Sequence, residues 1–174
     1  MTVHDQPSPG QPAGFRDAAA GGIFPGLLGG VVMALVLIAG GLLYGAAPAQ
    51  VMGSFDSSVA AGGATSDGLP LRGALNHLAV SCVYGSLFAV FTRALAAFLR
   101  SPARVVVWGL VYGLLLWLVA VTLLRQAAAS LLTVNAPEVF LLAHLAYGLT
   151  LGLAARRQVT GSALKPVEIT GQRR

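Results

Sequence analysis

The sequence contains little charge and a single cysteine. Asp, Glu, Lys and Arg make up only 10% of its 174 residues, well below the roughly 25% of an average soluble domain. The one cysteine, Cys82, excludes an internal disulfide and any metal site built from several cysteines. The low charge argues against a soluble globular domain.

Long runs without a charged residue dominate the chain, in which 56% of the residues are hydrophobic. Four such runs, each of about 17 to 22 residues, approach the roughly 20 residues that a helix needs to cross a bilayer. The sequence therefore predicts an all-α integral membrane four-helix bundle in residues 21–157. We expect disordered cytoplasmic tails at 1–20 and 158–174. The helices are expected at about 22–45, 73–93, 104–124 and 136–156.

The basic residues are distributed unevenly along the chain, whose net charge is +5. If the helices alternate in direction, one side holds Arg16, the loop between helices two and three, and the C-terminal tail. The other side holds only Arg72 and Arg125. The positive-inside rule then places both termini in the cytoplasm. We expect the basic groups to face anionic headgroups and not nucleic acid. The predicted inner-interface anchors are Arg93, Arg100, Arg104, Arg156 and Arg157.

Small residues recur at spacings of four within each predicted helix. Such rows let two backbones approach closely and favour helix association in lipid. We expect them to be packing seams, and small residues facing outward beyond these seams would favour binding of a partner. The predicted packing positions are Gly22, Gly26, Gly30, Ser81, Gly85, Ala89, Gly109, Gly113, Gly148 and Gly152.

Three tyrosines are predicted to lie at one depth. Tyr84 and Tyr147 each precede the arginine at the inner end of their helix by nine residues, and Tyr112 follows its inner arginine by eight. At about 1.5 Å per residue, all three lie roughly 12–14 Å from the arginine level, near the bilayer midplane. A hydroxyl there needs a partner. We expect interhelical hydrogen bonds, with a proton or ligand path as the alternative.

His77 and His144 are the histidines of the predicted membrane helices, and both fall in the outer half. Two histidines at similar depth on two helices can be the axial ligands of a b-type haem. The competing interpretation is that each makes an ordinary hydrogen bond near the interface. The sequence has no CxxCH motif and no further histidine pair, so we expect no cofactor beyond this haem alternative and no metal site.

Three segments carry a resemblance to a known group of proteins: GLLGGVVMALVLI in the first helix, WGLVYGLLLWLV in the third and HLAYGLTLGL in the fourth. They resemble the recurring segments of small bacterial four-helix membrane proteins that form domains of unknown function. The resemblance covers most of the membrane part. It implies four helices and a multi-pass protein of the bacterial inner (plasma) membrane, and it implies no activity.

The sequence contains no recognisable catalytic constellation: no nucleophile–base pair, metal cluster or phosphate loop. No acidic residue falls deep in a predicted helix, which argues against a coupled carrier. We therefore expect a protein that is not an enzyme, but an accessory, assembly or scaffolding subunit. It would bind another membrane protein or itself within the lipid bilayer. A small oligomeric transporter or channel is the alternative beside the haem subunit.

Overall fold

The computed structural model describes residues 14–56, 69–123, 132 and 134–163, with side chains as far as residue 157. The regular structure of these residues is entirely helical, and four of the helices are long and apolar enough to cross a membrane. The prediction of an all-α membrane protein with four spanning helices is confirmed. The elements are α1 (Phe15–Leu43), α2 (Pro48–Gly53), α4 (Pro70–Ala94), α5 (Pro102–Thr122) and α7 (Pro137–Ala163).

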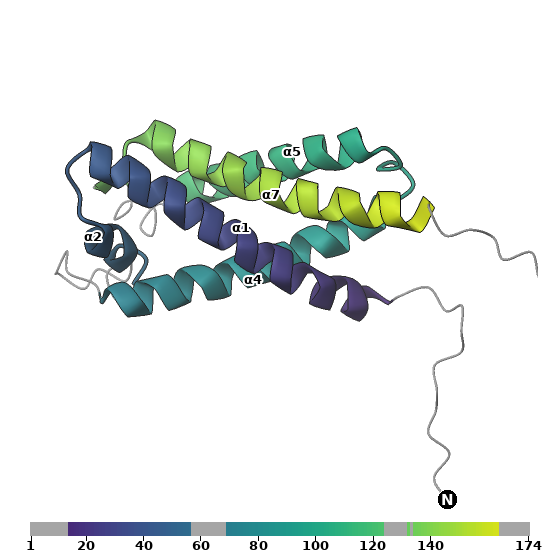
Figure 1. Ribbon diagram of the computed structural model, residues 1–174, viewed down its shortest axis with the longest axis horizontal. Coiled ribbons are helices and arrows are strands. Elements are labelled where there is room, and N and C mark those ends of the chain that lie inside the picture. The colour runs from purple at the N-terminus through teal and green to yellow at the C-terminus, as the bar shows by residue number, and fades with distance from the viewer. Residues whose placement is uncertain (1–13, 57–68, 124–131, 133, 164–174) are drawn as a thin grey trace, which may run out of the picture.

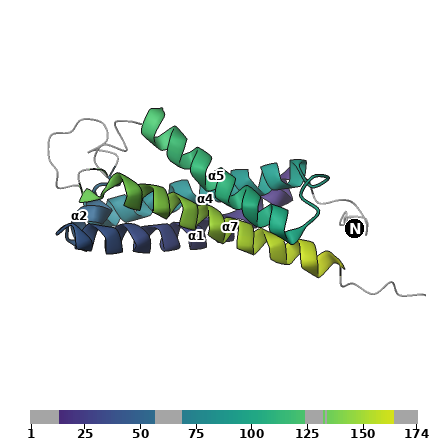
Figure 2. The same cartoon turned by 90° about the horizontal axis from the view of Figure 1, so that it is seen from above.

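The four long helices pack in the order α4–α1–α7–α5, which differs from their order along the chain. α1 lies between α4 and α7, and α5 packs chiefly against α7. α4 and α5 follow one another in sequence but touch at only a few positions. The view from above shows one end of α5 leaning away from the other helices (Figure 2). The bundle is therefore a curved, open row whose outer members, α4 and α5, come close to each other at only a few positions.

α1 begins at Phe15, seven residues before the predicted start at residue 22, because a capping box forms between Gly14 and Asp17. The amide of Gly14 donates to Oδ2 of Asp17 at 2.9 Å, which satisfies a group that would otherwise lack a partner at the helix start. Pro25 consequently lies inside α1, and its missing amide hydrogen leaves the carbonyl of Gly21 without the usual helical donor. The expected tail at 1–20 is thus helical from residue 15, and residues 1–13 lie outside the described part.

Proline marks the first position of the four other helices named above: Pro48, Pro70, Pro102 and Pro137. Its fixed φ suits a first helical turn, where the amide hydrogen has no helical acceptor anyway. The predicted starts at 73, 104 and 136 therefore move to these prolines. α5 ends at residue 122 instead of 124, and α7 continues through residue 163, so the expected C-terminal tail begins as helix.

A tight turn joins α1 to α2. Gly45 has φ +82°, and the amides of Gly45 and Ala46 donate to the carbonyls of Leu42 and Gly41. This is a Schellman ending, for which glycine is the favoured residue. The turn directs α2 back over the end of the bundle, where α2 contacts both α1 and α4 and the side chain of Val51 is fully buried.

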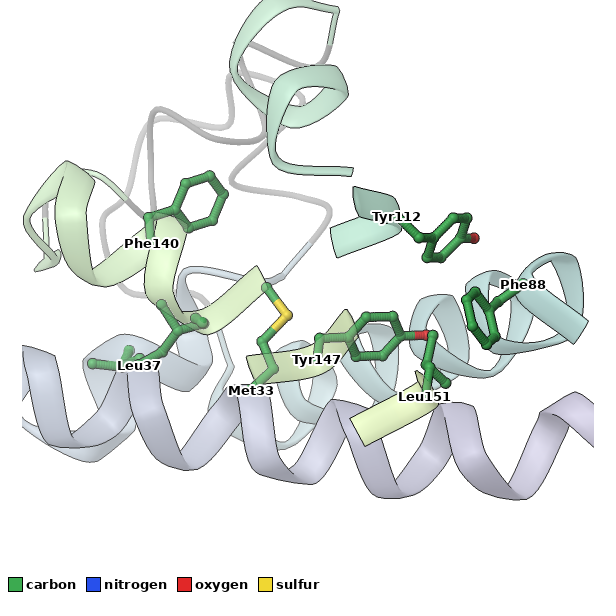
Figure 3. Packing of buried hydrophobic residues seen from close by; sticks show 9 residues of the cluster. Met33, Leu37, Phe88, Tyr112, Phe140, Tyr147 and Leu151 are labelled. Atoms are coloured by element: carbon green, nitrogen blue, oxygen red, sulfur yellow. The ribbon is translucent and has the colours of Figure 1, made fainter. Parts of the chain in front are cut away.

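The core lies where α1, α4, α5 and α7 face one another (Figure 3). Leu37, Phe140 and Leu151 are almost completely buried, and so is the ring of Tyr147. In Figure 3 the rings of Tyr147 and Tyr112 reach the side of the core formed by α4, beside Phe88. The two tyrosine hydroxyls therefore lie within the apolar core, and their hydrogen-bond partners are described below.

Candidate functional site

α1 and α4 cross in direct backbone contact (Figure 1). A Cβ atom on Gly26 would lie 2.5 Å from the carbonyl oxygen of Ser81 and 2.9 Å from Cα of Gly85. Gly22 faces the backbone of Gly85, and a Cβ on Gly30 would lie 2.6 Å from Oγ of Ser81. A larger residue at any of these glycines would push the helices apart. The structure therefore brings these five small residues together.

A second close contact joins α5 to α7. A Cβ on Gly109 would lie 2.9 Å from Cα of Gly152 and would also meet the backbone of Gly148. Gly113 faces the carbonyl of His144, and its Cβ would lie 3.3 Å from Cα of Gly148. Four further predicted packing positions thus meet in one interface. Ala89 is different, because it lines a cavity described below.

Adjacent glycine pairs in α1 are a signal that the sequence analysis missed. In the pair Gly29–Gly30, the second residue faces Ser81 of α4, whereas a Cβ on the first would lie 2.9 Å from the ring of Tyr147 in α7. Gly40 likewise faces Val139 of α7. Two neighbouring glycines point to different sides of a helix, so the pairs mark α1 as the helix with partners on both sides.

The glycines of the spanning helices are used almost entirely for contacts within the chain. Among the described glycines of the spanning helices up to Gly152, Gly21 alone has open space where a Cβ would be. An outward surplus of glycines that would favour a partner is therefore not found among these residues, although Ala39 and Ala79 are exposed small residues of α1 and α4.

Two of the three predicted tyrosines donate hydrogen bonds to the backbone of α4. The hydroxyl of Tyr147 donates to the carbonyl of Ser81 at 2.7 Å, and that of Tyr112 donates to the carbonyl of Tyr84 at 2.8 Å. α4 makes few other contacts with α5 and α7. These bonds therefore connect the two sides of the row. The ring of Tyr84 itself packs at the edge of the core.

The two histidines form separate hydrogen bonds. Nε2 of His77 lies 2.9 Å from the carbonyl oxygen of Gly30, which links α4 to α1, and the ring packs 4.3 Å from that of Phe55. Nδ1 of His144 bonds within α7 to the carbonyl of Phe140 at 2.8 Å. Both histidines are buried. Each side chain therefore has a structural partner.

A haem does not fit this arrangement. Nε2 of His77 is held against α1 beside Gly30, where the backbones of α1 and α4 are too close to admit a macrocycle. Iron ligation there would require breaking that bond and separating the two helices. Within the described residues, no group of three or more His, Cys, Asp or Glu side chains could hold a metal ion.

A buried carboxylate at the α2 end was not anticipated. Asp56 is only 1% exposed, and its Oδ2 accepts the amide of Leu69 at 3.0 Å, just before α4 begins. Nη1 of Arg72 lies 3.8 Å from the same oxygen. The side chain of Asn76 donates to the carbonyl of Phe55 at 3.5 Å. These contacts fasten the segment after α2 to the first turns of α4. The spacing of these residues in the sequence does not predict the contacts.

Arginines gather at the opposite end of the row, which we call the arginine end. Arg104 is fixed there: its Nη1 donates to the carbonyl of Phe98 at 3.1 Å, and its guanidinium lies 5.5 Å from the centre of that ring. At the α2 end, Arg72 is the one arginine in the described residues. The members of the arginine end are Arg16, Arg93, Arg100, Arg104, Arg156 and Arg157.

A cavity of about 660 Å³ lies at the arginine end, between the first turns of α1, the last turns of α4 and the C-terminal part of α7. Its walls combine apolar side chains with a few polar ones. The sequence analysis placed Arg93 and Arg100 at the membrane surface but did not anticipate the cavity. The apolar lining includes Pro25, Phe88, Ala89, Leu151 and Ala155, and the polar lining is Asp17, Thr92, Arg93 and Arg100.

Comparison with known proteins identifies one family. A family described as of unknown function (DUF6789) matches residues 16–163, which include all four spanning helices. No curated protein and no solved structure matches the chain. The family agrees with the resemblance noted from the helix segments and supplies no activity, ligand or partner.

Proposed function

Since the chain belongs to this family of unknown function, we propose from its own structure that it is a non-catalytic subunit of a membrane complex. In this role it assembles with, or provides a scaffold for, another membrane protein or a second copy of itself. The proposal rests on the exposed faces of the outer helices, because the glycines of the interior already contact other helices of the same chain.

The open row is the observation that supports this role. α5 has one major neighbour, α7, and the membrane-spanning window of α5 is 22% buried, against 39% for α1. Its exposed face presents large apolar residues at helical spacings of four, three and four. This stripe, which we call the α5 face, consists of Val107, Val111, Leu114 and Leu118. A helix of a partner would pack against such a face through side chains of this size.

The polar groups of the interior support a non-catalytic role. His77, Tyr112 and Tyr147 each bond to a backbone carbonyl of another helix, and the hydroxyl of Ser81 bonds to the carbonyl of His77. Groups engaged in this way hold helices together. In the described residues, Asp, Glu, Lys and Arg occur only near the ends of the spanning helices, which does not favour the alternative of a coupled transporter.

The charge distribution supports an orientation. Six arginines at the arginine end, against one described arginine at the α2 end, favour a cytoplasmic arginine end by the positive-inside rule. The N-terminus of α1 and the C-terminus of α7 both lie there, so both tails would be cytoplasmic (Figure 1). The resemblance to bacterial four-helix proteins adds the inner membrane as the proposed location.

Affinity purification of the full chain from its native membrane in mild detergent tests the role. We expect a stoichiometric membrane partner, or a homo-oligomer, identified by mass spectrometry and size-exclusion chromatography. Recovery of a monomer without any stoichiometric partner from gently solubilised membranes would overturn the proposal.

A matched pair of variants tests the surface. L114A with L118A shortens two side chains of the α5 face, whereas L28A with L35A shortens two exposed side chains of α1. We expect the α5 variant to lose the partner and the α1 variant to retain it. Equal retention by both variants would remove the α5 face from the proposal.

A further inference from the structure

The cavity at the arginine end has a structural origin in the crossing of α1 and α4. Gly22 and Gly85, which bring the two backbones into contact, are also lining residues of the cavity. Beyond this contact the helices diverge toward the arginine end, and α7 forms the third wall through Leu151 and Ala155. The cavity volume of about 660 Å³ lies within the range of roughly 300–1,000 Å³ typical of ligand sites.

The cavity lining has an apolar side and a polar side, which suits an amphiphilic ligand. Pro25, Ala89 and Ala155 form a partly exposed apolar wall, behind which Phe88 and Leu151 belong to the buried core. The polar groups come from the first turns of α1 and from the end of α4 and the segment after it. An apolar chain would lie along that wall with its polar head at the arginines. A water-soluble ligand would leave the wall without a complementary surface.

The charged lining favours an anion. Arg93 and Arg100 both line the cavity, and neither is paired with a carboxylate among the residues that the structure describes. Asp17 contributes one negative charge, but its Oδ2 is already bonded to the amide of Gly14. Two guanidinium groups and one carboxylate leave one positive charge, which a single phosphodiester would neutralise. Guanidinium groups bind phosphate oxygens through several donors.

Two further polar groups belong to residues that line the cavity. Oγ1 of Thr92 is buried and has no hydrogen-bond partner. The carbonyl of Gly21 lacks its usual helical donor, because the residue four positions later is Pro25. Gly21, Thr92 and Pro25 all line the cavity. A headgroup hydroxyl is a suitable donor for the carbonyl of Gly21, whereas the Thr92 hydroxyl is buried behind the cavity surface.

We propose that this cavity binds one anionic phospholipid, with its phosphate between Arg93 and Arg100, its headgroup hydroxyls toward the α1 side, and an acyl chain along Ala89 and Ala155. The site goes beyond the proposed assembly role and does not depend on it, because a single chain contains every lining residue. The site would hold one lipid at a defined position at the arginine end, whereas arginines spread over a charged surface would attract anionic lipids without fixing any of them.

The full chain, purified in detergent and delipidated, provides the test. We would titrate it with phosphatidylglycerol, phosphatidylcholine and inorganic phosphate, and read bound lipid by native mass spectrometry. We expect one phosphatidylglycerol per chain, and binding of phosphatidylcholine at least about fivefold weaker, since one basic group near an anionic headgroup contributes roughly that factor. Competition by inorganic phosphate at millimolar concentration would identify a small-anion site and overturn the lipid.

Charge-matched variants separate the cavity from the general surface. R93Q removes an arginine that lines the cavity, and R16Q removes one that lies at the same end outside it. We expect R93Q to weaken phosphatidylglycerol binding about fivefold and R16Q to leave it unchanged. Equal losses in the two variants would mean that the lipid is held only by the surface potential, which contradicts the proposal.

Filling the cavity tests the same site without changing any charge. A89W introduces an indole from α4, and A155W introduces one from α7, so a folding defect in one variant leaves the other for the measurement. Circular dichroism and size-exclusion chromatography would establish that the variant is folded. We expect a folded variant to lose the bound phosphatidylglycerol. Retention of the lipid at wild-type affinity would place it outside the cavity and overturn the inference.

Discussion

The hydroxyl of Tyr147 donates to the carbonyl oxygen of Ser81 at 2.7 Å, across 66 positions of the sequence. The same stretch of Ser81 backbone lies against Gly26 of α1. One residue of α4 therefore contacts two other helices, through a close backbone approach on one side and a hydrogen bond on the other. The hydrogen bond from Tyr147 is one of the few contacts between α4 and α7.

Removing the Tyr147 hydroxyl should weaken the bundle measurably but mildly. We expect Tyr147→Phe to lower the free energy of unfolding by about 1 kcal/mol, as for other hydrogen bonds between membrane helices. The loss is small because the aromatic ring stays in the core. Unfolding in mixed micelles with increasing dodecyl sulfate provides the measurement. Tyr44→Phe is the control, since Tyr44 is 64% exposed, and an equal loss there would contradict the assignment.

The close approach at Gly26 should tolerate no added methyl group. A Cβ there would lie 2.5 Å from the carbonyl oxygen of Ser81, so Gly26→Ala forces α1 away from α4. Overpacking of this kind costs about 1–3 kcal/mol of stability. Gly21→Ala adds the same methyl group in open space and should leave stability unchanged or raise it by up to about 1 kcal/mol, because alanine is the better helix former. Similar unfolding curves for both variants would refute the contact.

The buried carboxylate of Asp56 should matter more than its ion pair. Asp56→Ala leaves the amide of Leu69 without that acceptor, at a cost of about 1–3 kcal/mol. Arg72→Ala should cost less than about 1 kcal/mol, because its side chain is 56% exposed and lies 3.8 Å away. Hydrogen exchange in the first turn of α4 would report the difference. Faster exchange in the Arg72 variant than in the Asp56 variant would reverse the interpretation.

Cysteine labelling should establish the orientation. In a Cys82→Ser background, Ala49→Cys places an exposed thiol in α2, and Ala97→Cys places one in the segment after α4 at the arginine end. We expect a membrane-impermeant maleimide to label residue 49 in intact cells and to reach residue 97 only after permeabilisation. The opposite pattern would place the arginine end outside the cell.

The sequence predicts the number and type of helices well, because an uncharged run of about 20 residues has few alternatives to a membrane helix. It also singles out Gly26, Gly85, Gly109 and Gly148 as small residues on repeating rows. It does not predict which row meets which. That choice depends on the three-dimensional fit between helices, and the glycine pairs of α1 would have been the available clue.

The spacing of residues in the sequence predicts neither the cavity at the arginine end nor the burial of Asp56. Thr92 and Leu151 belong to helices that are far apart in sequence, and they share a cavity only because α1 and α4 diverge beyond Gly22. Asp56 becomes buried because α2 turns back over α4. Both features arise from the angles between helices, which periodicity does not encode.

The order α4–α1–α7–α5 has a consequence for biogenesis. When α4 leaves the ribosome, its packing partner α1 is already in the membrane, so this pair can form at once. α5 follows, but its main partner is α7, which is the last of these four helices to be synthesised. Until then α5 lacks the glycine contact with α7. A nascent chain truncated before residue 137 would leave Gly109 and Gly113 facing lipid or the insertion machinery. Completion of the fold therefore waits for the final helix.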